Sequence, residues 1–175
     1  DEMMIANNYH LMKQAIALKN TPLSMEMILK LHRTATLQAI ENNAIAGELR
    51  GDDEIFIADY DGNIIYQPPK STDLPNLMQS LCDFANTNHN GIDAEFIHPV
   101  IKAMILHFLV GFIHPFGDGN GRTARALFYW FMLKNGYWLF EYISISRLLK
   151  EAPAKYARAY LYTDCLLYTS PSPRD

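Results

Sequence analysis

The sequence predicts a mainly α-helical domain that contains one β-hairpin. Apolar residues recur at helical spacing through most of the chain, and the only β pattern lies between residues 54 and 67. Two strongly apolar segments, Phe96–Phe112 and Gly121–Lys134, are joined by a polar loop that is rich in glycine. Because both segments are apolar nearly all round, we expect them to be the buried central helices.

The N-terminal part of the chain predicts two helices. The first covers Met3–Leu18, and Pro22 follows its end. Ser24 is a suitable N-cap for the second, since its hydroxyl can accept a hydrogen bond from the first turn. The helical pattern is then lost over Ala46–Asp53.

A hairpin follows. Two short apolar segments, Glu54–Asp59 and Asn63–Gln67, flank Asp61-Gly62, which is a strong turn dipeptide, and Pro68-Pro69 closes the second segment. A single hairpin among helices has no partner sheet. We therefore interpret it as a flap that covers another part of the molecule.

The remaining elements are helical. The pattern over Asp73–Ala85 predicts a helix, with Asp73 as a possible N-cap. Asn135-Gly136 is a good C-terminal stop for the apolar helix Gly121–Lys134. Shorter helices are expected from Ser144 and from Pro153.

The two ends suggest a fragment. The chain begins at Asp1 inside a helix-like pattern, so we expect residues 1–164 to be one domain with a truncated N-terminus. Residues 165–175 change character, and their Ser-Pro alternation cannot continue a helix. We interpret that segment as a non-native or linker tail.

Composition narrows the class of protein. With 175 residues, of which 49% are hydrophobic and 12% aromatic, the chain can bury the core of one domain. A net charge of −4 argues against a basic nucleic-acid surface. Two cysteines make no disulfide framework, which fits a cytoplasmic protein. The most apolar run, Val100–Ile113, is too short to span a bilayer, and no membrane contact is expected.

The loop between the two apolar helices favours a phosphate site. Gly119, Asn120 and Gly121 stand where the second helix begins, where free N–H groups and the helix dipole attract anions. Arg122 and Arg125 are three residues apart, so they share one helix face and can reach the same polyphosphate.

Two further groups give the loop catalytic potential. Asp118 can hold Mg²⁺ with one oxygen while phosphate oxygens and water complete its coordination. His114 precedes the loop, and the unperturbed pKa of a histidine side chain, near 6.5, suits a general base. A plain helix connector would explain any one of these groups, but not all of them within twelve residues.

The other histidines do not predict a metal-binding site. His107 lies on an apolar helix and is expected to be a hydrogen-bonded core residue, and His98 before Pro99 a cap or surface group. His10, His32 and His89 show no partner spacing.

The stretch His114-Pro-Phe-Gly-Asp-Gly-Asn-Gly-Arg-Thr-Ala-Arg125 resembles the signature of the Fic family, and every fixed position of that signature is met. The resemblance extends from about Gly47 to Tyr137 and includes Gly47-Glu-Leu-Arg50 and the hairpin. It implies a Fic-type helical bundle with the hairpin flap over the active-site loop, and we expect a piece of a bacterial protein. The glycine at position 121 resembles the branch of the family that transfers AMP from ATP, because the phosphotransferase branch similar to Doc has lysine at this position.

The resemblance also implies roles. His114 would take the proton from a target hydroxyl, Asp118 would bind Mg²⁺, and Phe116 would fix the loop. The α-phosphate would be held by Asn120 and the amides around Gly119 and Gly121. Arg122 would hold the β-phosphate and Arg125 the γ-phosphate of ATP. A protein substrate would dock along the flap as an added strand, at Ile64, Ile65 and Tyr66.

The expected function is a protein adenylyltransferase that uses Mg-ATP and modifies a Ser, Thr or Tyr hydroxyl. The alternatives are a Fic-fold enzyme that removes AMP or transfers another phosphate-linked group, and a non-catalytic nucleotide-binding module. An inhibitory helix, upstream in the same chain or from a partner, would pair a glutamate with Arg125. Nucleic acid is expected only through a further domain that this sequence lacks.

Overall fold

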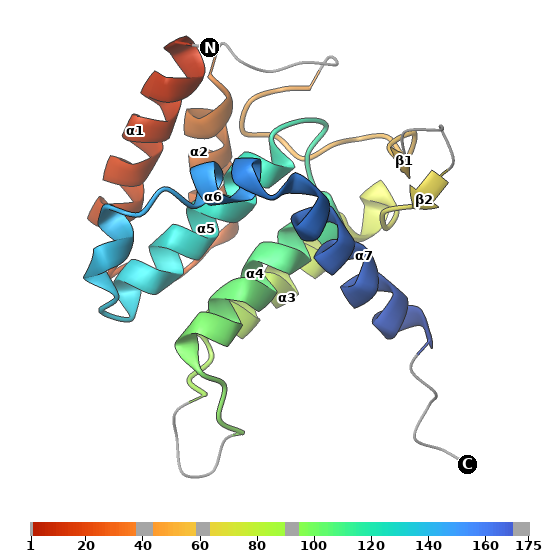
Figure 1. The fold of residues 1–175 in the computed structure, drawn as a ribbon. Helices are drawn as coiled ribbons and strands as arrows, with labels where there is room; N and C mark the ends of the chain where they lie inside the picture. The colour runs from red at the N-terminus through yellow and green to blue at the C-terminus, as the bar shows by residue number, and fades with distance from the viewer. Residues whose placement is uncertain (1, 38–43, 59–63, 90–94, 170–175) are drawn as a thin grey trace. The chain divides into compact units, whose positions relative to one another are not determined.

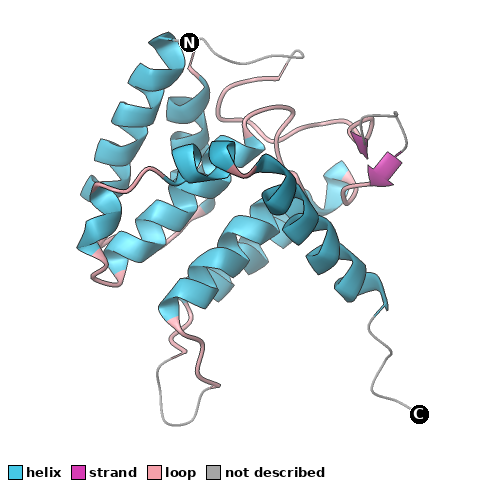
Figure 2. Ribbon diagram, viewed as in Figure 1, coloured by secondary structure: helices cyan, strands magenta, loops and turns pink. Residues whose placement is uncertain are grey.

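The structure is a computed structural model that describes residues 2–37, 44–58, 64–89 and 95–169 (Figure 1). Its residues form two compact units, Asp1–Glu141 and Tyr142–Asp175. The described residues are mainly helical, as the sequence predicts (Figure 2). The first unit contains, in chain order, α1 (Glu2–Ala17), α2 (Met25–Thr36), β1 (Ile57–Ala58), β2 (Ile64–Tyr66), a 3₁₀ turn (Ser71–Asp73), α3 (Leu74–Asn86), α4 (Pro99–Ile113), α5 (Asn120–Lys134) and a 3₁₀ turn (Trp138–Glu141).

Helices α4 and α5 lie at the centre of the first unit. They pack against each other, α1 and α2 pack against α5, and α3 packs against α4 (Figure 1). The apolar side chains between them are fully buried, among them Leu106, Val110, Leu127 and Trp130. The indole Nε1 of Trp130 donates to the carbonyl of Leu18, 3.0 Å away, which joins α5 to the end of α1. The two predicted central helices are therefore confirmed.

The helix ends follow local capping chemistry. The Ser24 hydroxyl accepts from the N–H of Met27 at 3.2 Å and begins α2. Helix α4 begins at Pro99, later than the predicted Phe96, because proline suits the first helical position and disfavours helix in the residue before it. His98 is a cap, as predicted, and its Nδ1 accepts from the N–H of Val100.

The strands are shorter than predicted. β1 and β2 pair antiparallel, with Ile57 opposite Tyr66 and Ala58 opposite Ile64, so the register shifts by one residue between these pairs. The predicted turn at Asp61-Gly62 lies outside the described residues.

The second unit contains α6 (Ile145–Glu151) and α7 (Pro153–Thr169). The Ser144 hydroxyl caps α6 by accepting from the N–H of Arg147 at 3.3 Å. Helix α7 crosses the predicted boundary at Asp164, so the first part of the predicted tail is helical, and residues 170–175 lie outside the described residues. Within the described ranges, no helix combines the length and apolarity that crossing a bilayer requires.

Candidate active site

His114 stands where α4 ends and the glycine-rich loop begins. Its backbone is left-handed, with φ 48° and ψ 57°, a region that residues other than glycine seldom adopt. Its N–H still donates to the carbonyl of Val110 at 3.0 Å. The left-handed turn therefore stops the helix at His114 and redirects the chain into the loop.

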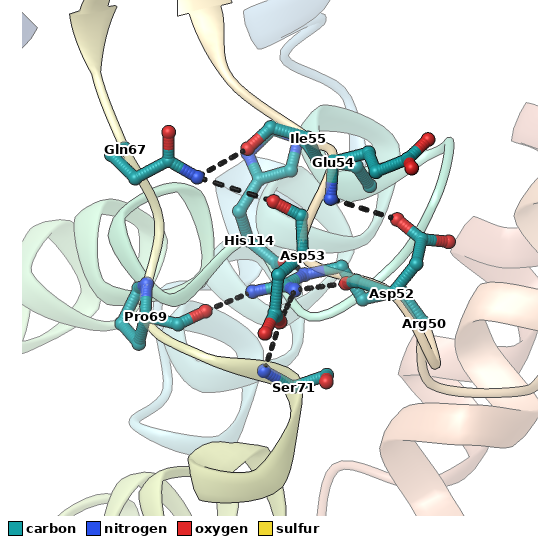
Figure 3. Close-up of polar contacts among 9 residues, drawn as sticks. All are labelled: Arg50, Asp52, Asp53, Glu54, Ile55, Gln67, Pro69, Ser71 and His114. Atoms are coloured by element: carbon teal, nitrogen blue, oxygen red, sulfur yellow. Dashed lines mark hydrogen bonds and ion pairs between the residues drawn. The ribbon is translucent and has the colours of Figure 1, made fainter.

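Arg50 holds this turn in place. Its Nε donates to the carbonyl of His114 at 2.8 Å, and its own N–H donates to the carbonyl of Pro115 at 2.9 Å. The rest of the buried guanidinium donates to the carbonyls of Asp52 and Pro69 and to the carboxylate of Asp53 (Figure 3). One side chain thus connects the end of α4 with the segments before β1 and after β2.

Asp53 extends this connection to the 3₁₀ turn that precedes α3. Its Oδ1 accepts from the N–H of Ser71 at 2.6 Å and from Arg50 at 3.3 Å (Figure 3). The hydrogen bonds from Ser71 and then from Arg50 hold the pKa of this carboxyl below its usual range. Gln67 donates to the carbonyls of Asp53 and Ile55, which ties the chain after β2 to the chain before β1.

A cavity of about 630 Å³ borders His114 and Gly117. Its other walls come from the segment 44–56, with carboxylates at Glu48, Asp52 and Glu54 and apolar side chains at Ile45, Leu49, Ile55 and Phe56. Burial, and to a lesser extent the charge of Arg50, lowers the pKa of His114. Its Nδ1 lies 3.3 Å from the carbonyl of Gly111, so Nδ1 carries the proton and Nε2 is the basic nitrogen.

The side chain of Asn120 makes hydrogen bonds within the loop. Its Oδ1 accepts from the N–H of Phe116 at 3.0 Å, and its Nδ2 donates to the carbonyl of Phe116 at 2.7 Å. Asn120 is buried, and Phe116 is fully buried. The side-chain amide of Asn120 therefore closes the loop, its contact with a nucleotide stays a prediction, and Phe116 fixes the loop in the core as predicted.

Gly119 is the N-cap of α5, and Gly121 lies in the first turn of that helix. Gly119 has φ 81°, and a Cβ there would lie 2.4 Å from Cγ2 of Thr36, so only glycine fits. Gly121 is exposed, and a Cβ there would lie 3.4 Å from Nη1 of Arg125. The first turn of a helix presents N–H groups that have no intrahelical partner, so this turn suits an anion.

Asp118 and Arg122 form an ion pair. Nη2 of Arg122 lies 2.8 Å from Oδ2 of Asp118, and both side chains are largely buried. Nη1 of Arg122 donates to the carbonyl of Ala35 at the end of α2, and Oδ1 of Asp118 accepts from the N–H of Gly119. The predicted metal ligand and the predicted phosphate ligand are thus brought together.

Arg125 lies one turn further along α5 and is half-buried. Its charge also affects His107 on α4. Burial first, and then the charge of Arg125, lowers the pKa of His107 to about 4, against a hydrogen bond with the backbone of Ala124 that raises it. His107 is therefore a neutral, hydrogen-bonded residue of the interior, as predicted.

His32 belongs to this site, although its spacing in the sequence gave no sign of a partner. The side chain is fully buried on α2, and its Nε2 lies 2.8 Å from the carbonyl of Asp118. Its Nδ1 accepts from the N–H of Gly47 at 2.8 Å, and its ring stacks on Phe116 with centroids 3.8 Å apart. The available signal was a polar residue at i+4 from Ile28, on the buried face of α2.

The three predicted flap residues have different surroundings. Ile64 is exposed, at 60%, and could meet a target. Ile65 lies in β2, and its side chain is outside the described residues. Tyr66 is buried, and its hydroxyl donates to the carbonyl of Phe112 at 2.7 Å. The side chain of Tyr66 therefore anchors β2 to α4, and docking of a target along this strand stays a prediction.

Comparison with known proteins adds an independent line of evidence. Residues 22–132 match the model of the Fic/DOC family. The chain is 30% identical over 119 residues to the protein adenylyltransferase Fic of Nematostella vectensis, covering 68% of this chain and 25% of that protein. It is 34% identical over 117 residues to the protein of the same name from Drosophila melanogaster, covering 66% and 21%. These animal relatives do not support our expectation of a bacterial source.

A solved structure resembles the fold. The Fic-domain-containing signaling protein of Bacteroides thetaiotaomicron superposes with a TM-score of 0.61 at 27% identity, covering 77% of this chain and 47% of that one. The chain thus spans about a quarter of the length of the curated relatives and about half of this structure.

Proposed function

Because the chain belongs to the Fic/DOC family, we propose that it is a protein adenylyltransferase, which transfers AMP from Mg-ATP to a Ser, Thr or Tyr hydroxyl of a protein. The observation that carries this proposal is the position of His114. It lies in the wall of the cavity and is bound through its carbonyl to the buried Arg50. The loop that it begins leads directly into the anion-binding turn of α5.

His114 is suited to be the general base of this reaction. Its lowered pKa leaves the imidazole neutral at neutral pH, and Nε2 is the nitrogen that accepts a proton. The target hydroxyl gives its proton to Nε2 while its oxygen forms a bond to the α-phosphorus of ATP. The bond between that phosphorus and the oxygen bridging to the β-phosphate breaks, and pyrophosphate leaves.

The polyphosphate is held by charge and backbone donors. The amides of the first turn of α5 face the α-phosphate region, Arg122 the β-phosphate and Arg125 the γ-phosphate. Arg122 exchanges its present bond to Asp118 for the nucleotide. These contacts stabilise the charge that develops as pyrophosphate departs.

Asp118 is our proposed contact to the magnesium ion of the Mg-ATP substrate. Among the described residues, no group of three or more His, Cys, Asp or Glu side chains could hold a metal by itself. A single carboxylate suits an ion that is held mainly by phosphate oxygens and water. Magnesium neutralises phosphate charge when it is bound.

The protein substrate is proposed to reach His114 from the flap. β2 carries the exposed Ile64, and Tyr66 and Gln67 fix the end of this strand to α4 and to the chain before β1. A target segment that adds to the strand edge would place its hydroxyl beside His114. Control by an inhibitory helix that pairs with Arg125 remains part of this proposal.

The test is incubation with Mg-ATP in a cell lysate, followed by mass spectrometry of the modified proteins. We expect peptides that carry the mass of AMP on a Ser, Thr or Tyr. Adducts with the mass of phosphate or phosphocholine, or loss of AMP from a modified protein, would instead support the other reactions of this fold.

A further inference from the structure

We infer that His32 is a positioning residue for the proposed reaction, because its two ring nitrogens join the glycine-rich loop at Asp118 to Gly47, in the segment 44–56 that supplies most of the cavity wall. This inference rests on the proposed function for its kinetic consequence. The two hydrogen bonds of His32, which we call the bridge, can be tested without measuring any enzymatic activity.

The two hydrogen bonds define the state of the ring. The Gly47 N–H can only donate, so Nδ1 of His32 must be an unprotonated acceptor. The Asp118 carbonyl can only accept, so Nε2 must carry the proton. His32 is therefore a neutral imidazole in the Nε2–H tautomer, with each nitrogen bound to a backbone group of a different segment.

The packing leaves the ring one position. Phe116 stacks on the ring with an interplanar angle of 4°. Gly119 passes so close that a Cβ there would lie 3.1 Å from Nε2 of His32 and 2.4 Å from Cγ2 of Thr36. Because the ring is fully buried and both nitrogens are occupied, His32 fits the role of a bridge rather than that of a nucleophile or a metal ligand.

The bridge acts at the point where the loop orients its functional groups. Asp118 O belongs to the peptide group that leads into Gly119, so holding this carbonyl fixes the plane of that peptide. The same peptide sets the direction of the Asp118 carboxylate and the left-handed turn at Gly119. Arg50 holds the beginning of the loop at His114 and Pro115, and His32 holds its middle.

Three variants separate the contributions. His32→Phe keeps the ring stack and loses both hydrogen bonds. His32→Gln keeps a donor at the distance of Nε2 for Asp118, and His32→Asn keeps an acceptor at the distance of Nδ1 for Gly47. The matched control is Trp130→Phe, which also removes a hydrogen bond from a fully buried ring to a backbone carbonyl, but between α5 and the end of α1.

Amide hydrogen exchange tests the bridge without activity. We expect roughly tenfold faster exchange at Gly47 in His32→Gln, through the loop 116–121 in His32→Asn, and at both places in His32→Phe. Unchanged exchange at both places in His32→Phe, or the same change in Trp130→Phe, would overturn the bridge. This result does not depend on whether AMP transfer occurs.

Steady-state kinetics, measured well below the melting temperature of each variant, then test whether His32 positions the loop for the reaction. We expect His32→Phe and His32→Asn to lower kcat by about 10- to 100-fold, since small displacements at a reacting centre cost that much. His32→Gln should restore kcat to within a few-fold of the wild type, and Trp130→Phe should leave it unchanged. Equal kcat for His32→Phe and the wild type would contradict positioning, whereas absent transfer in the wild type would contradict the proposed function instead.

Discussion

Nε of Arg50 donates a hydrogen bond to the backbone carbonyl of His114 over 2.8 Å, although the two residues are 64 positions apart in the sequence. The bond fixes the left-handed turn that ends α4. The same guanidinium also binds the chain on both sides of the two strands. The geometry of the candidate base therefore depends on a side chain far from the glycine-rich loop.

Arg50→Lys is expected to destabilise the protein despite keeping the charge. The ammonium group of lysine cannot reach the acceptors that the planar guanidinium joins at once, so buried acceptors lose their partner. We expect the free energy of unfolding to fall by roughly 2–4 kcal/mol in urea titrations. Arg147→Lys is the control. Among the described residues, this exposed arginine pairs only with Glu151, one helical turn away, so little change in unfolding free energy is expected. Equal stabilities of the two variants would contradict the role of Arg50.

Gly119→Ala is expected to prevent the loop from closing on α2. The new Cβ would meet Thr36 at 2.4 Å in a backbone region that alanine disfavours. Strain and overpacking together should cost roughly 2–5 kcal/mol of unfolding free energy.

Gly136→Ala is the matched control for backbone strain alone. Gly136 has a similar φ of 84°, and nothing lies within 4 Å of a Cβ there. Thermal unfolding of the two variants isolates the contact with Thr36. A Gly119→Ala variant no less stable than Gly136→Ala would show that α2 does not pack this closely.

The helices could be predicted from the sequence because their signals are local. The nearly continuous apolar character of two segments marked α4 and α5, and Ser24 and His98 are caps whose partners lie two or three residues away. The twelve-residue signature likewise marked the loop, since its groups are adjacent in the chain.

The rest of the site depends on contacts between distant segments. His32 and Asp118 are 86 positions apart, so no spacing pattern relates them. Tyr66 was expected only as part of the docking flap, and no local pattern relates its hydroxyl to the carbonyl of Phe112, 46 positions away. Asn120 was assigned to the nucleotide because its neighbours suit phosphate, whereas its amide closes the loop locally.

His107 should make stability depend on pH. Its pKa of about 4 in the folded state lies below the ordinary 6.5, so the unfolded state binds more protons between these values. Its contribution is complete above about pH 6.5 and is lost as the pH falls towards 4, by roughly 3 kcal/mol in all. Urea unfolding at about pH 7 and pH 4.5 should show a smaller loss for His107→Gln than for the wild type. The same loss in both proteins would contradict the buried neutral state.

Asp118→Asn and Arg122→Gln are expected to weaken binding of Mg-ATP. Each change keeps the approximate shape and removes a charge that we assign to the metal or to the β-phosphate. Isothermal titration should show roughly tenfold weaker binding for each variant. Unchanged affinity in both would count against these assignments.

The most direct test of the account is the fate of the α-phosphate. Protein substrate from a lysate is incubated with Mg-ATP labelled at the α- or at the γ-phosphate, with the wild type and with His114→Ala. We predict that only the α-label becomes bound to protein, and that His114→Ala lowers this transfer by about 100-fold or more while it still binds Mg-ATP. Protein-bound γ-label, or full transfer by His114→Ala, would contradict AMP transfer with His114 as the base.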